Sequence, residues 1–175
     1  MTAFFNVKGE NKNDDKEWYL FLSEQDGFSI EMPLNPETQE QVIPSDMGDL
    51  NLKIFMHKSQ DNNADNMLYM VMRTEYPESF TVHRDSILII EDFFQNAIYG
   101  ALNQVNGNLL TEKNIEYKEY PGKNVIISFQ NGQVMLNMRQ YLVDNYVYVL
   151  QVMTPKDKQG NESITKFFES FKLLE

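Results

Sequence analysis

The stretch from Lys123 to Met153 constrains the fold more than any other part of the chain. It contains three runs rich in β-branched and aromatic residues: Val125–Phe129, Val134–Val143 and Tyr146–Met153. Asn131-Gly132 separates the first two runs, and both residue types tolerate the positive φ angles of tight hairpin turns. Asp144-Asn145 separates the last two, and Pro155, which has no N–H for a ladder, ends the third. The stretch therefore predicts three consecutive antiparallel strands.

Shorter strands and one long helix are predicted ahead of this meander. Alternating or clustered apolar residues, bounded by turn residues, predict strands at 18–22, 28–32, 38–43, 50–56 and 67–76. The apolar period then changes to 3-4-4-3-4 between Ile87 and Val105, as in a helix with one core-facing stripe. Asp85 or Ser86 is expected to cap its start, and Asn106-Gly107 its end. Gly100 inside the helix predicts close packing against a neighbour.

The final elements complete an α+β pattern. Residues 109–118 are expected to be extended, and Tyr120-Pro121-Gly122 is expected to turn into the meander. A short second helix has Asn161 as its cap and an apolar stripe that includes Phe167 and Phe171. Strands joined by tight turns predict an antiparallel β-sheet flanked by helices, an α/β/α sandwich. We expect a mobile N-terminal segment over 1–17 and a single domain over 18–175.

The charge of the chain is negative and unevenly distributed. The formal net charge is −11, and residues 10–49 contain eleven acidic and two basic residues. Nucleic acids and anionic membranes require clustered Lys and Arg, so neither is expected as a partner. Ordinary solvated loops explain the acidic span, and the alternative is a surface for a basic protein partner. No apolar run approaches the length of a membrane helix, so membrane insertion is not expected.

No group of residues predicts catalysis, a cofactor or a metal site. The chain has no cysteine and two histidines. His57 falls on the polar side of an alternating strand in which Leu52 and Ile54 are expected to face the core, and His83 precedes the long helix; both are interpreted as surface residues. Asp61, Asn63 and Asp65 have the opening spacing of a calcium loop, but the glycine and the bidentate glutamate that such a loop needs are missing.

Leu88 and Ile89 are candidates for a binding surface. Both lie off the core stripe of the long helix, so its first turns are apolar nearly all round. A second segment of this chain, such as Phe4-Phe5, would cover them in one interpretation. In the other, they contact a partner protein or a second copy in a homodimer.

Arg139 and Tyr141 are the other candidates for partner binding. They share one face of the middle strand of the meander, and a charged residue in a central strand must reach water or a partner. We favour a solvent-facing arginine stacked on a tyrosine. The alternative is a clamp for an anion or a peptide carboxylate.

The chain resembles the bacterial PsbP-like group, which shares a fold with the photosystem II extrinsic subunit PsbP and a Ran-binding nucleotide-release factor. The resemblance covers about residues 18–174 and rests on the order of elements, on segments such as Asp26–Pro33 and Tyr120–Gly122, and above all on the terminal Phe167–Leu173 helix. It implies an antiparallel sheet between helices and an accessory, chaperone-like or binding role without shared catalytic residues.

Together these observations predict a non-enzymatic domain that binds another protein. The alternative is a carrier of a small ligand, held in a pocket between the long helix and the sheet. The chain as it stands has the features of a cytoplasmic protein, since Met1–Val7 lacks a basic region and a long apolar stretch. A leader upstream of Met1 would instead make it exported or lipid-anchored.

Overall fold

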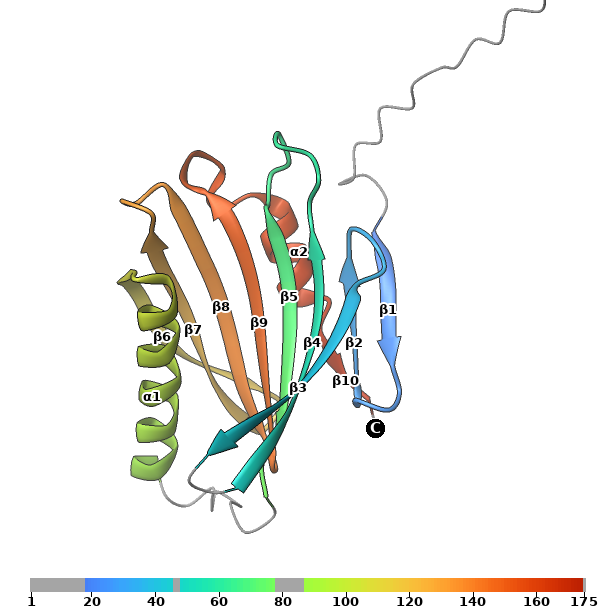
Figure 1. The fold of residues 1–175 in the computed structure, drawn as a ribbon, viewed down its shortest axis with the longest axis vertical. Coiled ribbons are helices and arrows are strands. Elements are labelled where there is room, and N and C mark those ends of the chain that lie inside the picture. Colours follow the sequence, from blue (N-terminus) through green and yellow to red (C-terminus); the bar gives the residue numbers. More distant parts are fainter. Residues whose placement is uncertain (1–17, 46–47, 78–86, 175) are drawn as a thin grey trace, which may run out of the picture.

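The structure, a computed structural model, describes residues 18–45, 48–77 and 87–174. A seven-stranded sheet forms its centre, with the strands in the order β3-β4-β5-β9-β8-β7-β6 and every neighbouring pair antiparallel. Its strands are β3 (Glu37–Ser45), β4 (Gly48–Lys58), β5 (Leu68–Glu75), β6 (Asn108–Tyr117), β7 (Tyr120–Phe129), β8 (Val134–Val143) and β9 (Tyr146–Pro155). Figure 1 shows this sheet with its helices on either side.

The predicted meander is confirmed as β7, β8 and β9. Gln130, Asn131 and Gly132 all have positive φ angles in the first turn, and Asp144 has one in the second. Val134 pairs with Phe129 on one side and with Pro155 on the other, so β8 is hydrogen-bonded along both edges. The turn chemistry of the sequence therefore sets the register of the central strands.

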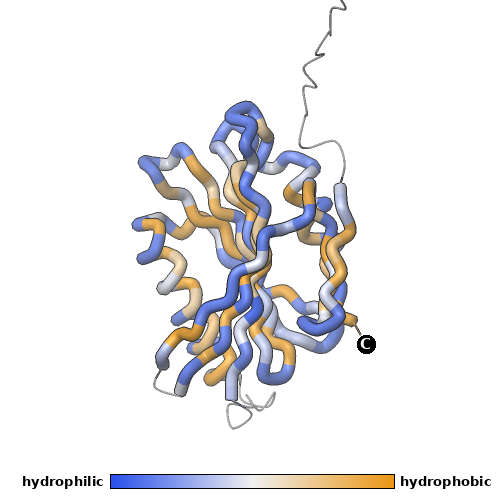
Figure 2. Tube along the Cα trace, turned by 45° about the vertical axis from the view of Figure 1, so that its right-hand side comes forward, coloured by the Kyte–Doolittle hydropathy of each residue, from blue (hydrophilic) through white to orange (hydrophobic). Residues whose placement is uncertain are grey.

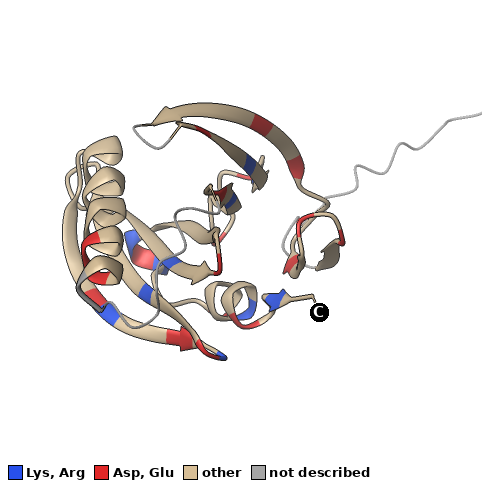
Figure 3. Cartoon of the chain, turned by 90° about the horizontal axis from the view of Figure 1, so that it is seen from below, with Lys and Arg blue, Asp and Glu red and all other residues tan. Residues whose placement is uncertain are grey.

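The seven-stranded sheet is the middle of three layers, with one outer layer on each of its faces. Helix α1 (Ile87–Val105) lies on one face, over β7. The other face carries helix α2 (Glu162–Glu169) and a small sheet with the order β1-β2-β10, made of β1 (Tyr19–Ser23), β2 (Phe28–Met32) and β10 (Lys172–Leu173). Figure 3, seen from below, shows α1 and the β3–β4 hairpin away from α2. The α+β prediction is confirmed, and β10 is an addition to it.

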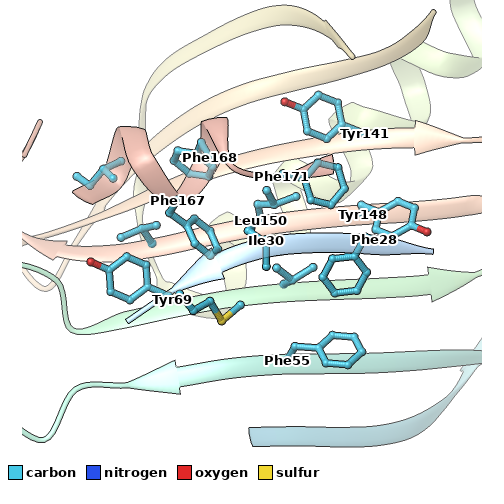
Figure 4. Packing of buried hydrophobic residues seen from close by; sticks show 14 of the residues in the cluster. Phe28, Ile30, Phe55, Tyr69, Tyr141, Tyr148, Leu150, Phe167, Phe168 and Phe171 are labelled. Atoms are coloured by element: carbon cyan, nitrogen blue, oxygen red, sulfur yellow. The ribbon is translucent and has the colours of Figure 1, made fainter. Parts of the chain in front are cut away.

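The largest core cluster fills the space between the seven-stranded sheet and the layer of β2 and α2. Figure 4 shows aromatic residues of β2, β4, β5, β8, β9 and α2 meeting in this cluster, together with Phe171. The ring of Phe171 stacks on Tyr141 with centroids 5.9 Å apart, and Phe167 meets Tyr69 at 5.4 Å. Asn161 caps α2 as predicted, its side chain accepting a hydrogen bond from the Ile164 amide at 3.2 Å. Helix α1 is held by separate clusters around Phe94 and Ile98.

The structure reverses the predicted faces of β4 from Leu52 onward, whereas Leu50, on the predicted apolar face, is buried. Phe55 and His57 face the large core, and His57 is 8% exposed and stacked on Tyr69. Leu52, Ile54 and Met56, predicted to face the core, are half-buried on the opposite face. The interpretation of His57 as a surface residue is therefore wrong. Strict alternation shows that two faces differ, but it does not say which one meets the larger core.

Two predictions about glycines are also wrong. Tyr120-Pro121-Gly122 begins β7 rather than forming a turn, and the chain turns earlier, at 118–119. An added Cβ at Gly122 would collide with the Gln140 carbonyl oxygen and with the Tyr141 ring, so this glycine allows β7 and β8 to approach closely. Gly100 is exposed, and a Cβ there would meet no atom within 4 Å.

Candidate functional site

An apolar surface on β4 and β5 is the first candidate site, here called the open face. It consists of Leu52, Ile54, Met56, Met70 and Met72. Ile54 pairs directly with Met72, and Met56 with Met70, so the side chains form one continuous strip across two strands. All five are half-buried, and within the described ranges none packs in the three core clusters.

The position of α1 explains why the open face is not covered by that helix. The order β4-β5-β9-β8-β7 places β4 four strands away from β7, over which α1 lies. Figure 1 shows α1 at one end of the sheet and β4 towards the other, and Figure 2 shows hydrophobic segments along the strands between them. A contiguous apolar strip of this kind is typical of a binding surface.

Polar residues of β3 border the open face. Glu37, Gln39 and Gln41 lie opposite Met56, Ile54 and Leu52, respectively, in the β3–β4 register, and all three are exposed. β3 is also an edge strand, and it lies within the acidic span found in the sequence. The border of the open face is therefore polar and carries the carboxylate of Glu37, as in the polar rim around the apolar centre of a protein interface.

The second candidate site is a pocket of about 610 Å³ between the first half of α1 and the β6–β7 hairpin, here called the helix pocket. The lining residues are Ile90, Glu91, Phe94, Asn114, Ile115, Glu116, Glu119, Pro121, Gly122 and Lys123. Such a volume lies within the range of small-molecule sites. The interface between the long helix and the sheet is therefore not closed by side chains along its whole length.

A buried ammonium group forms the polar end of the helix pocket. Lys123 on β7 is 4% exposed, and its Nζ donates to Oε1 of Glu91 at 2.7 Å and to Oε1 of Glu112 at 2.9 Å. Gln95 donates to the same two oxygens, at 2.9 and 2.7 Å. A buried lysine needs such partners, because an unpaired charge would be costly to desolvate.

Lys123 and Glu91 hold each other in their charged forms in the helix pocket. Burial lowers the pKa of Lys123, but the hydrogen bonds to Glu91 and Glu112 outweigh this effect and leave the pKa raised. The hydrogen bond from Lys123 lowers the pKa of Glu91. At neutral pH Lys123 is therefore a protonated structural cation and not a free amine nucleophile, which requires a lowered pKa.

A polar residue without a hydrogen-bond partner lies next to Lys123. Gln140 on β8 pairs with Lys123 across the ladder and is fully buried. Its Oε1 and Nε2 have no partner among the described residues. Buried amides of this kind are uncommon and are usually satisfied by an ordered water or a bound polar group.

A third polar cluster surrounds Asp26 at the β1–β2 turn. Oδ1 of Asp26 lies 2.8 Å from Nζ of Lys53 and 3.7 Å from Nη1 of Arg73, whose guanidinium lies 4.0 Å above the Tyr146 ring. Tyr148 donates to the Asp26 carbonyl oxygen at 2.8 Å. The hydrogen bond to Asp26 raises the pKa of Lys53. The cluster ties β2 to β4, β5 and β9, and its buried charges are compensated, which indicates a structural role.

Among the described residues, no group of three or more His, Asp or Glu side chains is arranged to hold a metal ion. No helix in the described ranges is long and apolar enough to cross a membrane.

Comparison with solved structures defines the fold. The chain is similar to cyanobacterial PsbP (CyanoP) from Synechocystis sp. PCC 6803, with a TM-score of 0.60 and 11% identity over 89% of this chain and 92% of that one. The chain has a PsbP-like fold. A Pseudomonas aeruginosa protein of unknown function aligns with a TM-score of 0.41 and 12% identity, over 85% of this chain and 90% of that one. No family model and no curated protein matches the chain.

In this PsbP-like fold the residues predicted to bind a partner do not form one site. Ile89 on α1 is 55% exposed, and the side chain of Leu88 lies outside the described part of the structure. Tyr141 is 5% exposed in the large core, against Phe171. Arg139 donates through Nη1 to Oε1 of Glu169 on α2 at 2.8 Å. The binding role of these four residues stays a prediction.

The environment of Arg139 differs in detail from the stacking that we favoured. Its guanidinium lies 4.9 Å from the ring centroid of Phe168 on α2, rather than over a tyrosine ring, and its Nε donates to Asn124 at 3.3 Å. The arginine therefore connects β8 to β7 and α2. These contacts occupy a large part of the guanidinium that an anion clamp would use.

Proposed function

We propose that the protein is a non-enzymatic domain that binds another protein, and that the open face is the contact surface. The observation that carries the proposal is the strip of five apolar side chains, Leu52, Ile54, Met56, Met70 and Met72, which lies outside the three core clusters of the described residues. Burying such a strip releases about 25 cal/mol per Å² of apolar surface. Three methionines give the strip an adaptable shape.

The chemistry of the partner follows from the border of the open face. Glu37 and two glutamines of β3 line one side, and the chain as a whole carries a net charge of −11. A partner segment with apolar side chains flanked by Lys or Arg matches both the strip and its border. Association with such a segment is expected to be faster at low salt, since screening weakens the attraction between separated charges.

Capture from an extract of the source organism at low salt, with a matched pair of variants, tests this proposal. Met72→Glu places a charge in the centre of the open face, whereas Val42→Glu places the same charge at an exposed position on the other face of β3. A specific partner should be retained by the wild type and by Val42→Glu and lost from Met72→Glu. The same purified partner binding all three equally, or no partner at all, would contradict the proposal.

A second function, carriage of a small ligand, is favoured by a separate observation. The helix pocket of about 610 Å³ combines apolar side chains such as Phe94 and Ile90 with the polar network of Lys123. This combination of an apolar wall with a few fixed polar groups is typical of ligand sites. The protein-binding proposal does not depend on it, because the open face and the helix pocket involve different strands.

A further inference from the structure

We infer that the helix pocket takes a small organic cation, a protonated amine on an apolar, ring-sized body. This inference rests on the second proposed function, carriage of a small ligand. It specifies the chemical class of that ligand from the charge and shape of the pocket.

The charged residues of the pocket give it a negative balance. Glu91, Glu116 and Glu119 line it, together with the single cation Lys123. Lys123 is already compensated by Glu91 and by Glu112 behind it. A further carboxylate, that of Glu116, is exposed at the rim. An approaching anion is repelled by this rim and a cation is attracted.

The network around Lys123 leaves acceptor atoms for a ligand. All four hydrogen bonds among Lys123, Gln95, Glu91 and Glu112 end at the Oε1 atoms of the two glutamates. A carboxylate has about four lone-pair sites on two oxygens. We assign Oε2 of Glu91, a residue that lines the pocket, and the rim carboxylate of Glu116 as acceptors for the ammonium group of the ligand.

The remaining lining selects the body of the ligand. Ile90 and Phe94 from α1, and Ile115 and Pro121 from the hairpin, supply apolar walls on two sides. Gly122 adds no side chain, so the ligand can reach the backbone of β7 there. A simple ammonium ion would leave these walls in contact with water, whereas an amine on an aromatic body would cover them.

Titration of the full chain with three indole compounds followed by amide NMR tests the inference. Tryptamine, indole-3-ethanol and indole-3-acetate share one ring and carry a positive, zero and negative charge. Tryptamine should shift the amide signals of Gly122 and Asn114 and bind at least about fivefold more tightly than indole-3-ethanol, because of the rim charge. Indole-3-acetate should bind most weakly.

Two variants distinguish the effect of the Glu116 charge at the rim from the effect of the net charge of the whole protein. Glu116→Gln should reduce the preference for tryptamine over indole-3-ethanol, and Glu162→Gln, at an exposed position on α2, should leave it unchanged. Equal binding of all three compounds at these amides would overturn the cation preference while keeping the carrier function. No shift at these amides with any of the three would overturn both.

Discussion

Nζ of Lys123 on β7 lies 2.7 Å from Oε1 of Glu91 on α1, and this ion pair joins the helix to the sheet across 32 residues of sequence. The hydrogen bond from Lys123 lowers the pKa of Glu91 below its ordinary value of 4.5. A group with a lowered folded-state pKa contributes stability above its unfolded pKa, and this contribution is lost as the pH falls through the folded value.

Glu91→Gln should therefore destabilise the protein near neutral pH and have little effect in strong acid. The expected loss is about 0.5–1 kcal/mol, since the Glu91 side chain is partly exposed and solvent screens the pair. Urea unfolding at a series of pH values measures it. Asp92→Asn is the control, because Asp92 is an exposed acid at the next position of α1. A loss that does not depend on pH would show that the ion pair is not its cause.

Gly122 and Gly100 should respond in opposite ways to alanine. At Gly122 a Cβ would collide with the Gln140 carbonyl oxygen and lie 2.7 Å from Cδ1 of Tyr141, so Gly122→Ala should cost about 1–3 kcal/mol. Gly100 lies in an exposed part of α1, and Gly100→Ala should stabilise the protein by about 0.5–1 kcal/mol. Thermal unfolding of both variants checks this pair, and a stabilised Gly122→Ala would refute the close approach of β7 and β8.

Phe171 should be one of the most sensitive positions of the large core. It is buried just after α2 and contacts Tyr141, Tyr148 and Phe28 with ring centroids 5.6–6.0 Å apart. Phe171→Ala should cost about 3–5 kcal/mol, because it leaves a cavity among rings that cannot all relax. Denaturant unfolding measures the loss, and a cost below about 1 kcal/mol would mean that the segment after α2 is not packed on the sheet.

Arg139 should contribute modestly to the attachment of α2. Arg139→Met keeps most of the aliphatic stem but removes the ion pair with Glu169 and the contact with the Phe168 ring. We expect a loss of about 1 kcal/mol in the free energy of unfolding, given the exposure of Glu169. A screen of acidic ligands against the wild type and Arg139→Met tests the alternative clamp role, and equal affinity in both would exclude that role.

The local elements could be predicted from the sequence where turn chemistry is explicit. Asn131-Gly132 and Asp144-Asn145 mark the turns of β7, β8 and β9, and the apolar period marks α1. The burial of β4 could not be predicted in the same way. Its alternation places Phe55 and His57 on the more polar side, and the aromatic layer of β2 and α2 that selects the Phe55 face is distant in sequence.

The candidate sites depended on three-dimensional pairing. Gly122-Lys123 resembles the end of a phosphate loop in sequence, but Lys123 acquires its role from Glu91 and Glu112, which lie on other elements. The open face arises because α1 covers one end of a sheet whose strand order differs from the chain order. In the sequence, Phe55 is the one large apolar residue on the polar side of β4, and its alternation alone does not show that the Leu52 and Ile54 side is left outside the core.

Methionine oxidation tests the central claim, that the β4–β5 strip is open in solution, most directly. Dilute peroxide with peptide mass spectrometry gives a rate for each methionine, with exposed Met67 as the fast reference and buried Met32 as the slow one. The account predicts that Met56, Met70 and Met72 oxidise about tenfold or more faster than Met32, since oxidation follows exposure. Rates as slow as that of Met32 would show that the strip is covered, and would contradict its role as a binding surface.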